Sequence, residues 1–181
     1  MIRHIYILLV ITMLISCSEH EDDSPNVPLR LNISIYNQPR ISKQAFQNGD
    51  KVGLYLVDYV DQVPGILGNV FQTRYFNIEY RLDNGGWYAA DGQEIYMNGN
   101  FSDLYTYYPY DPEMSRVSGK MDLTAYPFSI ETEQSDLSDA NDFLWAKSSL
   151  LSASDAQANI IFRHLMSRIE VNLDFNDGME I

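Results

Sequence analysis

Cys17 is the one cysteine of this 181-residue chain, and its thiol is the group whose position most clearly indicates a chemical reaction. It follows 5–15, an unbroken run of apolar or weakly polar residues behind a short N-terminus with one cation, Arg3. The run is about half of the roughly 20 residues that span a bilayer, so it is typical of a secretory signal peptide. A single cysteine also excludes an intrachain disulfide and any metal site built from several cysteines.

The four residues Leu14-Ile15-Ser16-Cys17 resemble the lipobox of bacterial lipoproteins. In that class the cysteine thiol is diacylated, the chain is cut before it, and the new amine is usually acylated. The resemblance implies that 1–16 is a lipoprotein signal peptide and that Cys17 is the lipidation site. Two or three acyl chains hold a protein stably on a membrane. Removal of 1–16 also removes Arg3, so the mature formal charge becomes −14, from 11 cations and 25 acids.

The segment 17–28 is predicted to be an acidic tether. Four acids occur among the six residues 18–23, and 24–28 then consists largely of turn and breaker residues. A solvated linker explains this composition. The acidic stretch also resembles the export signal that sends lipoproteins of some Gram-negative anaerobes to the outer face of the outer membrane. We therefore expect a surface-exposed lipoprotein of the cell outer membrane.

Motifs for catalysis or cofactor binding are absent from the sequence. It contains no Gly-x-Ser-x-Gly, His-Glu-x-x-His, Walker or EF-hand pattern, which predicts a protein that is not an enzyme and holds no cofactor or metal. Asp136, Asp139 and Asp142 offer oxygen ligands for calcium, but the loop lacks the expected glycine, and a solvated loop is the favoured interpretation. His164 is interpreted as a packed structural residue. The excess of 25 acids over 12 bases argues against a nucleic-acid partner.

A group of tyrosines could stack against sugars. Tyr105 and Tyr107 would share one face of a strand with Phe101, while Tyr108 and Tyr110 would fall on the opposite face. One of the two sets is therefore expected in the core. A complete aromatic platform is the less favoured interpretation.

Period-two alternation dominates the body of the chain. Leu29, Leu31, Ile33 and Ile35 alternate with polar residues or tyrosine, which predicts a strand with one buried face. Further strands are expected at 52–56, 73–82, 87–88, 94–97, 101–110, 122–130, 142–146, 158–162 and 169–175. Turn signals separate them, among them Asp83-Asn84-Gly85-Gly86. Short strands at regular spacing predict an all-β antiparallel sandwich or barrel over 29–181.

Four blocks in order resemble the fimbrillin-like (minor-fimbrium) family. They are Phe46–Tyr55, Leu104–Tyr110, Asn141–Ala146 and Ile161–Ile169. The resemblance implies a subunit or accessory protein of type V pili or related surface fimbriae. It further implies two successive transthyretin-like β-sandwich domains of Greek-key type, of which this chain would cover the N-terminal one. Asp177-Gly178 near the end of the chain also suggests a turn whose return strand lies beyond it, so we expect a truncated chain.

The family resemblance also implies a mode of assembly. An arginine-directed protease removes the first strand of the lipidated precursor, and the vacant groove accepts a strand from the next subunit. Residues 29–36 are the candidate leaving strand. Arg40 follows that strand and Arg30 lies at its start, so cutting at Arg40 would release it whole. Arg40 is the preferred processing site, and other fimbrial subunits are the expected partners.

A second interpretation remains open at this point. The exposed aromatics could make this a surface lipoprotein that binds glycans. The two interpretations differ in one simple observation, because a fimbrial subunit should form ladders resistant to sodium dodecyl sulfate after arginine-specific proteolysis. A glycan binder should stay monomeric and shift on gels that contain polysaccharide.

Overall fold

The computed structural model describes residues 26–36, 45–115 and 143–165, and they form an all-β fold. The strands are β1 (Val27–Pro28), β2 (Arg30–Ile35), β3 (Lys51–Asp58), β4 (Thr73–Asp83), β5 (Gly86–Ala89), β6 (Tyr96–Met97), β7 (Ser102–Tyr108), β8 (Leu144–Leu151) and β9 (Gln157–His164). Two short 3-10 turns, η1 (Ala90–Gly92) and η2 (Pro112–Ser115), interrupt them. The strands predicted at 122–130 and 169–175 lie outside the described residues.

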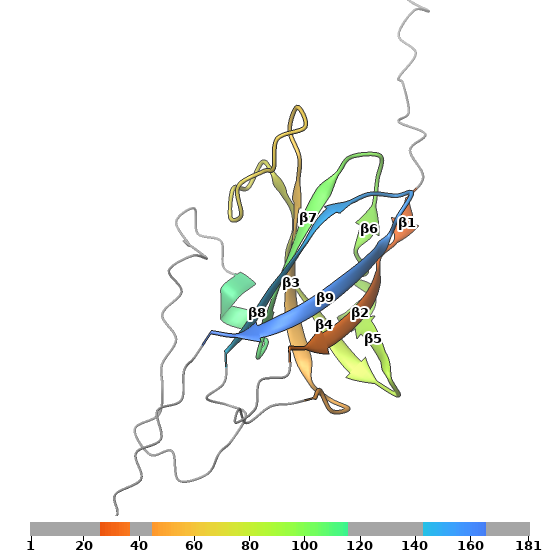
Figure 1. Ribbon diagram of the computed structural model, residues 1–181, viewed down its shortest axis with the longest axis vertical. Helices are drawn as coiled ribbons and strands as arrows, with labels where there is room; N and C mark the ends of the chain where they lie inside the picture. Colours follow the sequence, from red (N-terminus) through yellow and green to blue (C-terminus); the bar gives the residue numbers. More distant parts are fainter. Residues whose placement is uncertain (1–25, 37–44, 116–142, 166–181) are drawn as a thin grey trace, which may run out of the picture.

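Seven strands pair in the order β2-β9-β8-β7-β3-β4-β5, and β1 pairs separately with β6. β9 pairs with β8 at two positions, Leu144 with His164 and Trp145 with Arg163. Beyond these pairs β9 leaves the edge of β8 and, with β2, crosses in front of the other strands (Figure 1). The result is a sandwich with a small layer, β2-β9, over a large layer, β8-β7-β3-β4-β5. The predicted β-sandwich is confirmed.

One strand pair departs from the antiparallel expectation. β2 and β9 are parallel over six register pairs, from Arg30–Gln157 to Ile35–Phe162. A parallel pair needs a long connection, and here nearly the whole described domain lies between the two strands. The turn signals of the sequence report antiparallel hairpins between neighbouring strands, which is why they do not reveal this pairing.

The main core lies between the two layers. Leu54, Leu56 and Leu104 from the large layer are fully buried against Ile160 and Phe162 of β9. Leu29 and Ile35, which flank or end β2, are also buried in this core. Burial of such side chains stabilises the fold by about 1.5–3 kcal/mol each. The small layer is therefore the cover of the core.

A second apolar cluster lies on the opposite face of the large layer. It consists of Tyr55, Tyr107 and Met114, with Leu67 and Phe76 among the partly buried residues around it. β3 is therefore buried on both faces from Val52 to Val57. The alternation of its apolar residues predicted only one buried face. Its neighbours in space produce the second face: η2 and the loop after β3 fold back over the sheet.

The turn between β4 and β5 forms as predicted. Asn84 and Gly85 have φ values of 48° and 82°, and Asp83 pairs with Gly86 across the hairpin. Positive φ at both central residues is the geometry that Asn-Gly favours. No helix within 26–36, 45–115 and 143–165 is long and apolar enough to cross a bilayer.

Candidate functional site

β2 lies at the end of the sheet order and is hydrogen-bonded to one strand, β9, in the described part of the chain. The ladder begins where the Arg30 N–H donates to the Ala156 carbonyl at 2.9 Å. It ends where the Tyr36 N–H donates to the Phe162 carbonyl at 2.8 Å. A strand at the edge of a sheet leaves one row of main-chain groups without a strand partner. Within 26–36, 45–115 and 143–165, therefore, one ladder and one apolar face hold β2 in place.

The apolar face of β2 is the one predicted from the sequence. Leu29 and Ile35 are buried at the two ends, and Leu31 and Ile33 are partly buried against the same core. The alternate residues Arg30, Asn32, Ser34 and Tyr36 are exposed. Side chains of a strand alternate between its faces, so every second residue enters the core. The segment 29–36 therefore contains a strand, β2, with one buried face, as predicted.

The polar face of β2 makes weak contacts with β9. The Asn32 amide donates to Asn159 Oδ1 at 3.0 Å, and the Ser34 hydroxyl lies 3.5 Å from the Ile160 carbonyl. The Arg163 guanidinium lies 5.2 Å from the centre of the Tyr36 ring. Exposed contacts of this kind contribute little to stability because water competes for the same groups. The apolar face and the main-chain ladder therefore contribute most of the attachment of β2 to the domain.

Several buried residues around β2 were not assigned to the site from the sequence. Ala158, Ile160 and Phe162 of β9 are buried beside it, and their period-two spacing was the available signal. Phe46 packs its ring against those of Trp87, Tyr108 and Phe162, with centroids 5.2–5.4 Å apart. The chain therefore re-enters the core at Phe46, ten residues after Tyr36.

The N-terminal segment reaches a second edge before β2 begins. Val27 and Pro28, predicted as the end of the tether, form β1 and pair with Met97 and Tyr96 of β6. The Leu29 N–H donates to the Ile95 carbonyl at 2.8 Å. The described N-terminal residues therefore cross from the β6 edge to the β9 edge.

The processing and lipidation residues are only partly described. Arg30 is exposed and is the first residue of β2. Arg40, Cys17 and the segments 1–16 and 17–25 lie outside the described residues. The same holds for Asp136, Asp139 and Asp142. Within the described ranges, no three His, Cys, Asp or Glu side chains form a group that could hold a metal ion. His164 is the last residue of β9 and is partly buried beside Leu144.

The four tyrosines do not form a common stacking surface. Tyr107 is fully buried in the second cluster and Tyr108 is buried in the main core. The Tyr107 hydroxyl donates to Asn77 Oδ1 at 2.6 Å, and burial raises the pKa of Tyr107 well above its ordinary value. The Lys147 ammonium lies 5.0 Å from the centre of the Tyr105 ring. Tyr110 follows the end of β7 and packs on the cluster of Tyr107, not on the face of Tyr108 as predicted.

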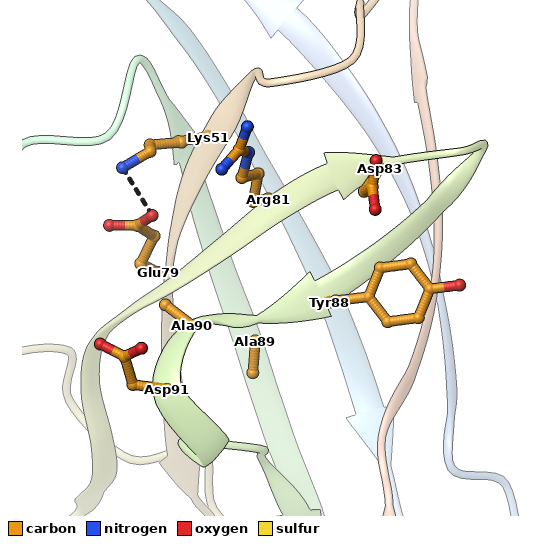
Figure 2. Close-up of a pocket in the computed structure, with 8 residues that line it drawn as sticks. All are labelled: Lys51, Glu79, Arg81, Asp83, Tyr88, Ala89, Ala90 and Asp91. Carbon is orange, nitrogen blue, oxygen red and sulfur yellow. Dashed lines mark ion pairs between the residues drawn. The ribbon is translucent and has the colours of Figure 1, made fainter.

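A polar hollow lies on the outer side of β3, β4 and β5 (Figure 2). Its wall carries the cations Lys51 and Arg81 and the carboxylates of Glu79, Asp83 and Asp91. Lys51 Nζ and Glu79 Oε1 form an ion pair at 2.7 Å. Small-molecule sites are usually enclosed and largely apolar. This hollow is open and of mixed charge, so it does not have the character of such a site.

Comparison with known proteins places this chain in a family. The model of the fimbrillin-like family matches residues 39–181, and the chain belongs to that family. No curated protein matches the sequence.

Solved structures are similar to this chain at low sequence identity. A proposed cell adhesion protein of Bacteroides ovatus superposes with a TM-score of 0.54 and 21% identity, over 77% of this chain and 53% of that one. A proposed cell adhesion protein of Bacteroides uniformis gives 0.48 and 20%, over 77% and 48%. A fimbrial protein of Bacteroides ovatus gives 0.46 and 20%, over 78% and 29%. The chain thus spans about half or less of the length of these structures.

Proposed function

We propose that this chain is a structural subunit or accessory protein of a cell-surface fimbria of the type V pilus kind. It is exported as a lipoprotein acylated at Cys17, and it assembles with other fimbrial subunits by strand exchange at β2. Membership of the fimbrillin-like family supports the fimbrial role and a location on the cell surface. One observation supports β2 as the exchanged strand. Among the strands that the structure describes, it lies at the end of the sheet with a single ladder, and it covers the main core with alternate apolar side chains.

Loss of β2 would open a groove that exposes unpaired main-chain groups and apolar side chains. The outer row of β9 main-chain groups would lose its partners, and Ala158, Ile160 and Phe162 would lose part of their cover. A strand with alternate apolar residues can pair with these main-chain groups by hydrogen bonds and also fill the side-chain pockets. The body would keep its remaining strands, because β3, β4, β7 and β8 pair without β2.

The preferred cut is at Arg40, between the end of β2 and the return of the chain at Phe46. A cut there would free the whole of 29–36 while Phe46 stays packed against Trp87 and Phe162. A cut at Arg30 would leave 31–35 attached to the body. Arg40→Ala should therefore prevent loss of the strand, and Arg30→Ala should not. Retention of the strand is measured by mass spectrometry of the precursor after arginine-specific proteolysis, and strand loss in Arg40→Ala would contradict this site.

A disulfide between β2 and β9 tests the exchange itself. Asn32 and Asn159 are register partners with side chains already 3.0 Å apart, and neighbouring strands lie about 4.8 Å apart, within reach of a disulfide. The probe is a fluorescent peptide with the sequence of 29–36. After arginine-specific proteolysis it should bind the Asn32→Cys/Asn159→Cys protein when reduced and not when oxidised.

Two controls complete this experiment. Asn32→Cys alone should bind the peptide under both conditions, because it has no partner thiol on β9. The uncut protein should not bind it, because its groove is filled. Equal binding by the oxidised and reduced double variant, or no binding by any cut protein, would contradict strand exchange at β2.

The glycan-binding alternative has less support in the described residues. Tyr107 and Tyr108 are buried, so the aromatic surface that favoured it does not form.

A further inference from the structure

The loop that joins β3 to β4, residues 59–72, carries an unusual amount of exposed apolar surface. We call it the apolar loop. Phe71 is 95% exposed, and Ile66 and Val63 are 67% and 63% exposed. Val70 and Val60 are about half exposed. Contiguous exposed apolar surface on a soluble domain usually marks a contact with another molecule or with a membrane.

The apolar loop is held in shape by its own hydrogen bonds. Val60 and Val63 exchange two main-chain bonds at 3.0 and 2.9 Å, and the Ile66 N–H donates to Gln72 Oε1 at 2.9 Å. Asn69 Oδ1 accepts from the Phe71 N–H at 2.9 Å. Apolar insertion is costly when main-chain groups lack partners, and these bonds supply partners within the loop.

The base of the apolar loop is fixed to the body. A Cβ on Gly65 would lie 2.4 Å from the Asp58 carbonyl oxygen, so the chain passes directly over the end of β3 there. Leu67 packs against the second cluster. Phe71 and Ile66 are therefore presented to solvent by a backbone that the body positions.

The charge of the apolar loop restricts its partner. Asp61 is the one charged residue in 59–72, and the loop has no lysine or arginine. The whole chain carries a formal charge of −13. An anionic surface would repel it, and a second copy would do the same. An uncharged apolar phase is the partner that this composition fits.

The apolar loop lies at the end of the molecule where the described N-terminus lies (Figure 1). Arg74, just after the loop, donates from Nη1 to the Tyr96 carbonyl at 2.9 Å, and Tyr96 is the register partner of Pro28 in β1. The nine residues 18–26 separate β1 from Cys17, a reach of at most about 36 Å. An acyl anchor on Cys17 would therefore keep this end of the domain near the bilayer.

We propose that the apolar loop inserts into the uncharged apolar layer of the lipid surface that anchors the protein. The proposal rests on the lipid anchor of the proposed function. A lipid phase needs no complementary shape, which suits a single protruding loop. A stable protein interface takes about 20–30 residues from each partner, and the apolar loop has 14. Insertion would orient the domain with β1 toward the membrane and the C-terminal ends of β2 and β9 away from it.

The test places an environment-sensitive fluorophore on the full, acylated chain in phosphatidylcholine vesicles. The label is attached to Val70→Cys in the loop, and the matched control is Tyr88→Cys, 60% exposed on β5 near the start of β3. Val70 should show a blue-shifted emission and several-fold stronger quenching by nitroxide-labelled lipid than Tyr88. Adding Phe71→Ser to the Val70→Cys protein should abolish the difference, and Phe71→Trp should retain it, because the side chain makes the contact.

Two results would overturn the proposal. Water-like emission from both labels would mean that the anchor alone holds the protein. A blue shift at Val70 that lipid-borne nitroxide does not quench would mean that protein covers the loop. Partial replacement of phosphatidylcholine by phosphatidylglycerol should weaken the signal at low salt and salt should restore it, by screening of like charges.

Failure of the anchor gives a different signature. An unacylated Cys17 adds a second reactive thiol to each labelled variant, and the protein then washes off the membrane. That result would contradict the lipoprotein part of the proposed function. The labelled chain mixed with excess vesicles would still report whether the apolar loop inserts, because Val70 and Tyr88 are then compared without the anchor.

Discussion

The two layers of the sandwich hold their strands in different ways. In the large layer, β3 has a ladder on each side, with β4 and β7, and it is buried on both faces. In the small layer, as far as the described residues show, β2 has one ladder and one buried face. Removal of β3 would break two ladders and expose two apolar clusters, whereas removal of β2 would break the one described ladder and expose one face of the core. This difference in packing is what the proposed strand exchange at β2 requires of the domain.

The largest expected contrast is between two leucines on these strands. Leu56 in β3 is fully buried, and Leu56→Ala should lower the free energy of unfolding by about 3 kcal/mol through lost burial and the cavity that remains. Leu31 in β2 is partly buried, and Leu31→Ala should cost about 1 kcal/mol. The measurement is the midpoint of urea unfolding at constant slope. Similar losses at both sites would mean that β2 is as fixed as β3.

A smaller contrast separates the polar contacts of the two layers. Lys147 Nζ lies 2.6 Å from Asp103 Oδ2, and the Asp103 side chain is 1% exposed. Lys147→Met would leave this buried carboxylate without its cation and should cost about 2 kcal/mol, moderated because the lysine itself is part-exposed. Asn32→Ala should cost less than about 0.5 kcal/mol, because its bond to Asn159 is exposed. An equal cost in both variants would remove the distinction between the layers.

The pH dependence of this pair has a definite sign. Burial lowers the pKa of Lys147, but hydrogen bonds from its ammonium group to Asp103 and Tyr105 outweigh burial, so the pKa is raised above 10.5. A raised pKa in the folded state means that the proton stabilises the fold below the ordinary value. That stability is lost as pH rises through the raised pKa. Urea unfolding of the wild type and of Lys147→Met should therefore differ most at neutral pH and converge in strongly alkaline solution.

Local sequence patterns predicted elements more reliably than their partners. The alternation of Leu29, Leu31, Ile33 and Ile35 identified both the strand and its buried face, because the side-chain period of a strand is a local property. The same pattern could not show that β2 pairs in parallel with β9. Ile33 and Ile160 are far apart in sequence, and pairing between them depends on how the intervening strands pack.

Residues with two competing environments were the hardest to place. The tyrosines of β7 were predicted to divide between core and solvent, yet Tyr107 and Tyr108 are both buried, because each face of β7 meets its own apolar cluster. Gly53 gives no sequence signal of its position beneath Tyr107, where a Cβ would lie 2.1 Å from the ring. The turn signals between the strands expected at 52–56 and 73–82 predicted a connection correctly, but not that Phe71 would be exposed.

The sequence by itself determined the all-β composition, the buried face of β2 and membership of the fimbrillin-like family, because these follow from side-chain chemistry and short-range spacing. The tertiary structure alone decided that β2 lies at an edge beside β9, that β3 is enclosed, and that the apolar loop lies at the end of the molecule where β1 lies. These features depend on contacts between distant parts of the chain, and such contacts are set by the packing of the whole domain.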